Sequence, residues 1–144
     1  MTLGRATVLY DRAHADALPV IETGEDVDAL IDTLLANPPH RNLAEVHSLE
    51  RELMPSGWPD HELLVGVNAE RGVGVLEFMD DGNYVSLGPD EGNGPVKYCL
   101  ADNPTEFPGW AEIPVELVRQ AVKEFLGSRG RRPTCVEWRI PEIW

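Results

Sequence analysis

Histidine and cysteine are the side chains that most often hold a metal ion or take part in nucleophilic catalysis. This sequence has four histidines and two cysteines: His14, His40, His47, His61, Cys99 and Cys135. A zinc site gathers such ligands at the short spacings of a helix or a hairpin. No histidine here has a cysteine or a second histidine within four residues. The spacing therefore predicts no metal site and no cofactor.

Motifs for nucleophilic attack and phosphate binding give no stronger signal. His47 and Ser48 are adjacent, but neighbours on a predicted strand point to opposite faces and cannot share a proton. Gly72-Val73-Gly74 lacks the lysine and hydroxyl residue of a phosphate loop, and its glycines instead predict a bulge or a closely packed neighbour. With 25 acidic residues, carboxylate pairs at catalytic separations arise by chance. We therefore expect no catalytic residue and no enzymatic activity.

The charge of the chain points to binding. Its 25 acidic residues against 12 lysines and arginines give a formal net charge of −13. Such a field repels nucleic-acid phosphates and anionic membranes, so neither is an expected partner. It speeds the encounter with a basic protein, in a manner that salt weakens. The alternative reading is that the charge serves solubility alone.

Acidic side chains concentrate in the middle of the chain. Between residues 72 and 118, nine acidic residues accompany a single basic one, Lys97. Segments 80–83 and 90–94 have the Asp, Asn and Gly content of tight turns, and the second lacks the residue order of an EF-hand. Four acidic residues lie in these segments: Asp80, Asp81, Asp90 and Glu91. We expect them at exposed loop tips, in contact with a partner.

Two tryptophans, Trp58 and Trp110, lie between glycine and proline or alanine in predicted loops. A loop tryptophan can anchor an interface because it offers a large contact area with few rotatable bonds. The alternative is that each ring folds back to close one end of the core. Trp138 alternates with Val136 and Ile140, which predicts a core position.

Two helices are expected to position these residues. Thr23 followed three residues later by Asp26 forms a capping-box pattern, and Asn37-Pro38-Pro39 ends the helical periodicity. A second apolar stripe, residues 117–126, follows Pro114, which fits the first turn of a helix.

Strand-like alternation fills most of the remaining chain. The predicted strands are residues 6–10, 43–49, 63–68, 73–79, 84–87, 96–100 and 136–140, and residues 101–113 are predicted to be a loop. Short connections favour an antiparallel meander. We expect an α+β fold, a curved antiparallel sheet of about six or seven strands with two helices packed on one face. The whole chain, 1–144, is predicted to be one domain.

The expected location is the cytoplasm. No apolar run reaches the roughly 18–20 residues that span a bilayer, and the first five residues lack the pattern of a secretory signal. Cys99 and Cys135 are expected to be reduced, half-buried strand residues, and their distance from each other stays open.

The chain resembles the Imm1 immunity proteins of bacterial polymorphic toxin systems, which are common in actinobacteria. The resemblance rests on ordered fragments across most of the chain: Tyr10-Asp11, 25–31, 64–68, 72–76, Glu106-Phe107-Pro108, 111–114, 118–121, 124–126, Arg132-Pro133 and 136–138. It implies an α+β protein that binds and blocks a cognate toxin, often a nucleic-acid deaminase with a basic active site. No contact residue is carried over from the family, because its motifs are expected to hold the fold.

Other roles remain open at this point. The chain could be an accessory or regulatory protein, or an α+β domain that binds or converts a small molecule, in an actinobacterial biosynthetic setting. The oligomeric state and the binding face are also open.

Overall fold

Ten strands and two long helices form the described part of the chain, residues 2–92 and 94–141 of a computed structural model. The helices are α1 (Gly24–Ala36) and α2 (Val115–Gly127). The strands are β1 (Ala6–Leu9), β2 (Val20–Ile21), β3 (Leu43–Ser48), β4 (Glu62–Asn68), β5 (Val73–Met79), β6 (Asn83–Ser86), β7 (Val96–Leu100), β8 (Asn103–Phe107), β9 (Ile113–Pro114) and β10 (Trp138–Arg139). None of the helices in these residues is long and apolar enough to cross a bilayer.

Helix α1 begins where its capping box predicts. The Thr23 hydroxyl accepts a hydrogen bond from the Asp26 N–H at 3.0 Å, and the Asp26 carboxylate accepts one from the Thr23 N–H at 3.2 Å. These bonds satisfy amides that a helix start leaves without partners. A hydrogen bond from the Glu22 N–H at 2.8 Å, together with the two bonds to Thr23, lowers the pKa of Asp26 against the opposing effect of burial. The helix ends at Asn37, before the two prolines.

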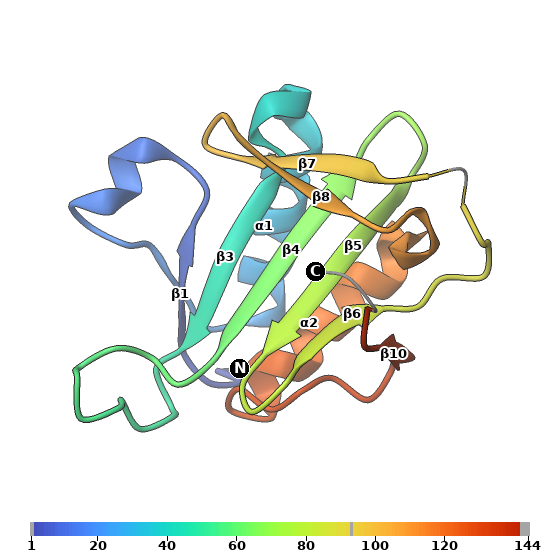
Figure 1. Ribbon diagram of the computed structural model, residues 1–144. Coiled ribbons are helices and arrows are strands. Elements are labelled where there is room, and N and C mark those ends of the chain that lie inside the picture. Colours follow the sequence, from blue (N-terminus) through green and yellow to red (C-terminus); the bar gives the residue numbers. More distant parts are fainter. Residues whose placement is uncertain (1, 93, 142–144) are drawn as a thin grey trace.

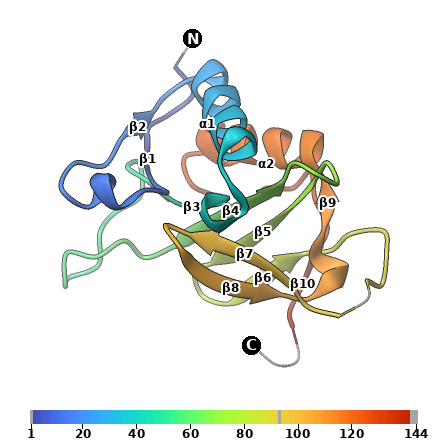
Figure 2. The same ribbon diagram turned by 90° about the horizontal axis from the view of Figure 1, so that it is seen from above.

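The two helices pack side by side on one face of the sheet (Figure 2). Their apolar stripes meet the same core, in which Ile31 of α1 and Phe125 of α2 are fully buried. At the outer edge of this contact, Asp28 of α1 accepts hydrogen bonds from Lys123 at 3.0 Å and from Arg119 at 3.2 Å. The expectation of an α+β fold with two helices on one face is confirmed.

The main sheet has the strand order β10-β6-β5-β4-β3-β1-β2, and β9 pairs with β5 beside it. Every pairing is antiparallel. Strands β3 to β6 form the predicted meander. The predicted strand at 136–140 is shorter than expected, since β10 covers only Trp138–Arg139.

The opposite face of the sheet is partly covered by a separate hairpin, β7–β8 (Figures 1 and 2). Two predictions are wrong here, because the strand at 96–100 does not continue the meander and residues 103–107 are a strand instead of a loop. The hairpin lies across the sheet because Tyr98 packs onto Gly66. A Cβ atom on Gly66 would lie 2.7 Å from the Tyr98 ring, so only glycine admits this contact.

Alternation along the strands separates two cores. Val65 and Phe78 face the helices, whereas Leu43, Leu64 and Val75 face the hairpin. The hairpin covers only part of its side of the sheet. Titratable and apolar side chains gather on the part of the sheet that the hairpin leaves open.

Candidate partner-binding site

The uncovered part of the sheet forms a hollow of about 610 Å³, which we call the sheet groove. It lies on the hairpin side of the sheet, and its lining includes residues of the loops 10–19 and 49–61. Figure 1 shows these two loops beside the same end of the sheet. Side chains at alternate strand positions form its floor: Thr7 and Leu9 of β1, Glu45 and His47 of β3, Glu62 of β4 and Met79 of β5. Because the strand period is two, all of these side chains share one face of the sheet.

The walls of the groove are apolar and exposed. Leu18, Met54 and Trp58 line it, and the Trp58 residue is 70% exposed. Six of the seven exposed large hydrophobic residues in the described chain belong to the segments 18–20 and 49–58. Exposed apolar side chains that gather in this way are typical of contact surfaces, and this makes the groove the candidate binding site. Trp58 therefore does not plug the core.

Trp58 sits on a tightly bonded turn. The Met54 N–H donates to the Trp58 carbonyl at 2.8 Å, and the Gly57 N–H donates to the Met54 carbonyl at 2.8 Å. Gly57 has a φ of 87°, a conformation that suits glycine. At the base of the loop, Arg51 donates to Asp60 at 3.0 Å and to the Gly130 carbonyl at 2.9 Å. The indole is presented to solvent by a backbone that is held in place.

The floor brings two carboxyl groups together. Glu45, His47 and Glu62 each place one side-chain oxygen or nitrogen within 4.8 Å of the others. Burial, the charge of Glu45 with its hydrogen bond, and the charge of Glu77 raise the pKa of Glu62 to about 7. Glu62 therefore titrates close to neutral pH, well above the acidic range that is usual for a glutamate.

The histidines of the groove do not offset this charge. Burial lowers the pKa of His47, against the opposing effect of Glu45. Burial also lowers the pKa of His61, whose Nε2 accepts from the Ser48 N–H at 2.8 Å and whose Nδ1 lies 3.0 Å from Asp60. Both rings are neutral at pH 7. The floor is thus acidic between apolar walls.

Metal binding is the other chemistry that this floor allows. Within the described chain, Glu45, His47 and Glu62 are the group of potential ligands that comes close enough together. Their atoms are spread over up to 4.8 Å, and Glu62 shares a hydrogen bond with Glu45. We therefore treat the three side chains as a charged floor and do not assign them as metal ligands.

Glu62→Gln is expected to raise the free energy of unfolding by about 1 kcal/mol at pH 8 and to change it little at pH 4.5. The pKa of Glu62 is about 7 in the folded protein against an ordinary value of 4.5. The folded protein therefore binds the proton more tightly, and stability falls as pH rises between these values. Urea unfolding at both pH values measures the difference. Glu91→Gln at an exposed position serves as the control. An equal gain in the free energy of unfolding from Glu62→Gln at both pH values would show that the pKa of Glu62 is not raised in the folded protein.

Trp58 and Asp80 are the sequence-predicted site residues that the structure places in the sheet groove. Asp81 follows Asp80 on the β5–β6 turn, where its N–H donates to the Asp80 carboxylate at 2.6 Å, but it does not line the groove. Arg51 lies 3.9 Å from Asp80 and partly neutralises it. Of the six predicted site residues, Trp58 and Asp80 thus line the sheet groove and Asp81 lies next to Asp80 in sequence. Asp90, Glu91 and Trp110 lie in other parts of the structure.

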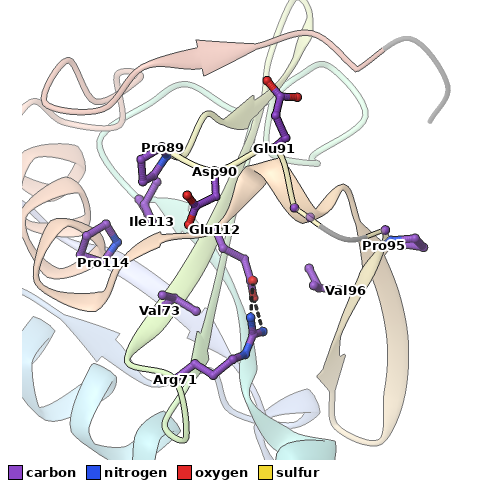
Figure 3. A pocket seen from close by; sticks show the side chains of 13 residues that line it. Arg71, Val73, Pro89, Asp90, Glu91, Pro95, Val96, Glu112, Ile113 and Pro114 are labelled. Carbon is purple, nitrogen blue, oxygen red and sulfur yellow. Dashed lines mark hydrogen bonds and ion pairs between the residues drawn. The ribbon is translucent and has the colours of Figure 1, made fainter.

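Asp90 and Glu91 line a second hollow of about 610 Å³, which we call the loop hollow (Figure 3). Arg71 and Glu112 join across it through two hydrogen bonds of 2.7 and 2.6 Å. The Tyr98 hydroxyl donates to the same Glu112 carboxylate at 2.6 Å, so that this charge is already satisfied within the fold. Figure 3 shows the Glu91 carboxylate pointing away from this pair. No aromatic side chain lines the described part of this hollow.

Trp110 is half-buried and packs against the hairpin core. The Arg139 guanidinium lies 4.7 Å from the centre of its ring. One face of the indole is therefore already occupied by a side chain of this protein. Trp110 is thus less available to a partner than Trp58, which is 70% exposed.

The sequence prediction did not include Glu45, His47 and Glu62. Glu45 and His47 are two residues apart on one predicted strand, and this spacing indicated that they share a face of the sheet. Glu62 joins them only through the register of β3 and β4, in which Val46 pairs with Leu63. No short-range spacing carries that information.

Comparison with models of known protein families gives a match over most of the chain. The family model described as "Immunity protein Imm1" matches residues 17–140. The matched stretch includes the apolar wall residues Leu18, Met54 and Trp58 of the sheet groove. It also includes the three floor residues Glu45, His47 and Glu62. No curated protein matches the chain.

Proposed function

The chain belongs to the Imm1 family of immunity proteins, and we propose that it neutralises a cognate toxin by binding it at the sheet groove. Family membership gives the immunity role. The observation that carries the choice of surface is the exposed Trp58, which stands on an apolar wall beside an acidic floor. Tryptophan is common among the residues that dominate the binding energy of an interface, because it buries a large area on binding.

In this proposal the toxin presents a basic surface. The chain has a net charge of −13, and two carboxyl groups lie on the groove floor beside the neutral His47. An enzyme that acts on nucleic acid, such as a deaminase, needs basic side chains around its active site to hold phosphates. The immunity protein would occlude that cleft in a one-to-one complex in the cytoplasm, where Cys99 and Cys135 stay as the free thiols that they are in this structure.

Co-expression tests the proposal. The product of the neighbouring gene is induced in a host cell with this chain, with the variant Trp58→Ala, or with Asp90→Asn/Glu91→Gln. The proposal expects growth rescue by the wild type and by the loop-hollow variant, and reduced rescue by Trp58→Ala. Absence of rescue by the wild type would overturn the pairing. Full rescue by Trp58→Ala with loss in the loop-hollow variant would overturn the choice of surface.

A further inference from the structure

We propose that the sheet groove is an arginine-binding site, which takes one arginine side chain of the partner with its guanidinium on Glu45 and Glu62 and its stem along Trp58. This inference rests on the proposed function and names the chemistry of the contact.

The charge that remains available in the groove is on its floor. Asp60 and Asp80 line the groove as well, but Arg51 lies 3.0 Å from Asp60 and 3.9 Å from Asp80. The interaction with Arg51 lowers the pKa of Asp60 against the opposing effect of burial. Glu45 and Glu62 have neutral His47 as their neighbour and no cation from the described chain against them in the groove. An incoming cation is therefore drawn to this pair.

The acceptor groups and the apolar walls of the groove favour arginine over lysine. Two adjacent carboxyl groups offer several acceptor oxygens, and the planar fork of a guanidinium can bond to two of them at once. Its apolar stem and flat face suit an exposed indole and the side chains of Leu18 and Met54. The volume of about 610 Å³ is within the range of roughly 300–1,000 Å³ that is usual for ligand pockets.

Arginine binding should release a proton. The charged and titratable groups around Glu62 come from β3, β5 and the adjoining loops: Glu45, His47, Arg51, Asp60, His61, Glu77 and Asp80. A guanidinium favours the ionised form of Glu62, and arginine itself does not titrate near neutrality. With the pKa of Glu62 at about 7, affinity for arginine should rise about tenfold between pH 6 and pH 8. The lowered pKa of His47 keeps that ring neutral through most of this range.

The test uses N-acetyl-arginine amide as the probe, titrated into isotope-labelled protein at pH 6 and pH 8 and followed by NMR. N-acetyl-citrulline amide is the matched probe, because it keeps the shape and lacks the charge. We expect saturable shifts at the Trp58 indole N–H and at groove amides, with affinity at pH 8 at least fivefold higher for arginine than for citrulline. Glu45→Gln/Glu62→Gln should abolish this preference, and Trp58→Ala should weaken binding at least threefold.

The control variant Asp90→Asn/Glu91→Gln removes the same formal charge from the loop hollow and should bind the arginine probe within twofold of the wild type. Equal binding of citrulline, unchanged binding by Glu45→Gln/Glu62→Gln, or shifts confined to the loop hollow would each overturn the inference. Saturable Zn²⁺ binding at the groove without arginine binding would also overturn it and would assign a metal site instead. Since the probe needs no toxin, failure here leaves the co-expression test of the proposed function intact.

Discussion

Trp58→Ala is expected to weaken binding to the cognate toxin at least thirtyfold, about 2 kcal/mol, without changing the melting temperature of the free protein. The indole is 70% exposed, so the core loses no packing when it is removed. Substitutions at such positions usually change stability by less than about 0.5 kcal/mol. Calorimetric titration of the toxin and thermal unfolding of the variant measure the two quantities.

Trp110→Ala is the matched control for this loss of an indole. Trp110 packs against the hairpin core and lies under Arg139, so its removal should lower the melting temperature and leave toxin affinity within about threefold of the wild type. The opposite pattern, with strong loss of binding from Trp110→Ala and none from Trp58→Ala, would place the interface at the loop hollow.

Tyr98→Ala is expected to lower the free energy of unfolding by about 4 kcal/mol. The Tyr98 residue is 1% exposed, and its ring lies on Gly66 and 5.8 Å from the centre of the Phe107 ring. Its hydroxyl also ties the hairpin to Glu112. Without the ring, the hairpin loses its main contact with the sheet and leaves a cavity above Leu43. Urea unfolding measures the effect.

Tyr98→Phe separates packing from hydrogen bonding. It keeps the ring and removes only the bond to Glu112, which still has two bonds from Arg71. A loss of about 1–2 kcal/mol is expected. If Tyr98→Ala were no more destabilising than Tyr98→Phe, the ring would not be what holds the hairpin on the sheet.

Elements defined by local signals were predictable from the sequence. Helix α1 follows from the Thr23–Asp26 capping box and the prolines after it, and these are interactions between near neighbours. Strands β4 and β5 follow from dense apolar runs that are buried on both faces. In each case the determining residues lie within the element itself.

Strand β8 was not predictable in the same way. Four of its five residues are polar or proline, and only Phe107 is buried. The turn that leads into it uses Ala101 at a φ of 47° and Asp102 at 76°, in place of the glycine that usually marks such a turn. The hairpin is held by Tyr98 on Gly66, a contact across 32 positions that no local pattern reveals.

The same distinction between local signals and long-range contacts applies to the residues of the candidate site. Trp58 and Asp80 could be found because loop tryptophans and acidic turns are visible locally. Glu45 and Glu62 could not, because only the pairing of β3 with β4 brings their carboxyl groups together. The raised pKa of Glu62 is a property of that pairing and of the burial it produces.

Hydrogen–deuterium exchange of the complex locates the bound toxin on this chain and so tests whether the sheet groove is the binding surface. We expect toxin binding to slow amide exchange in residues 49–61 and in the loop of residues 10–19, both of which contribute lining residues to the sheet groove. Exchange in residues 88–92 and 109–112 of the loop hollow should change little. Slowed exchange confined to the loop hollow or to the outer faces of α1 and α2, with none at the sheet groove, would show that the toxin binds elsewhere.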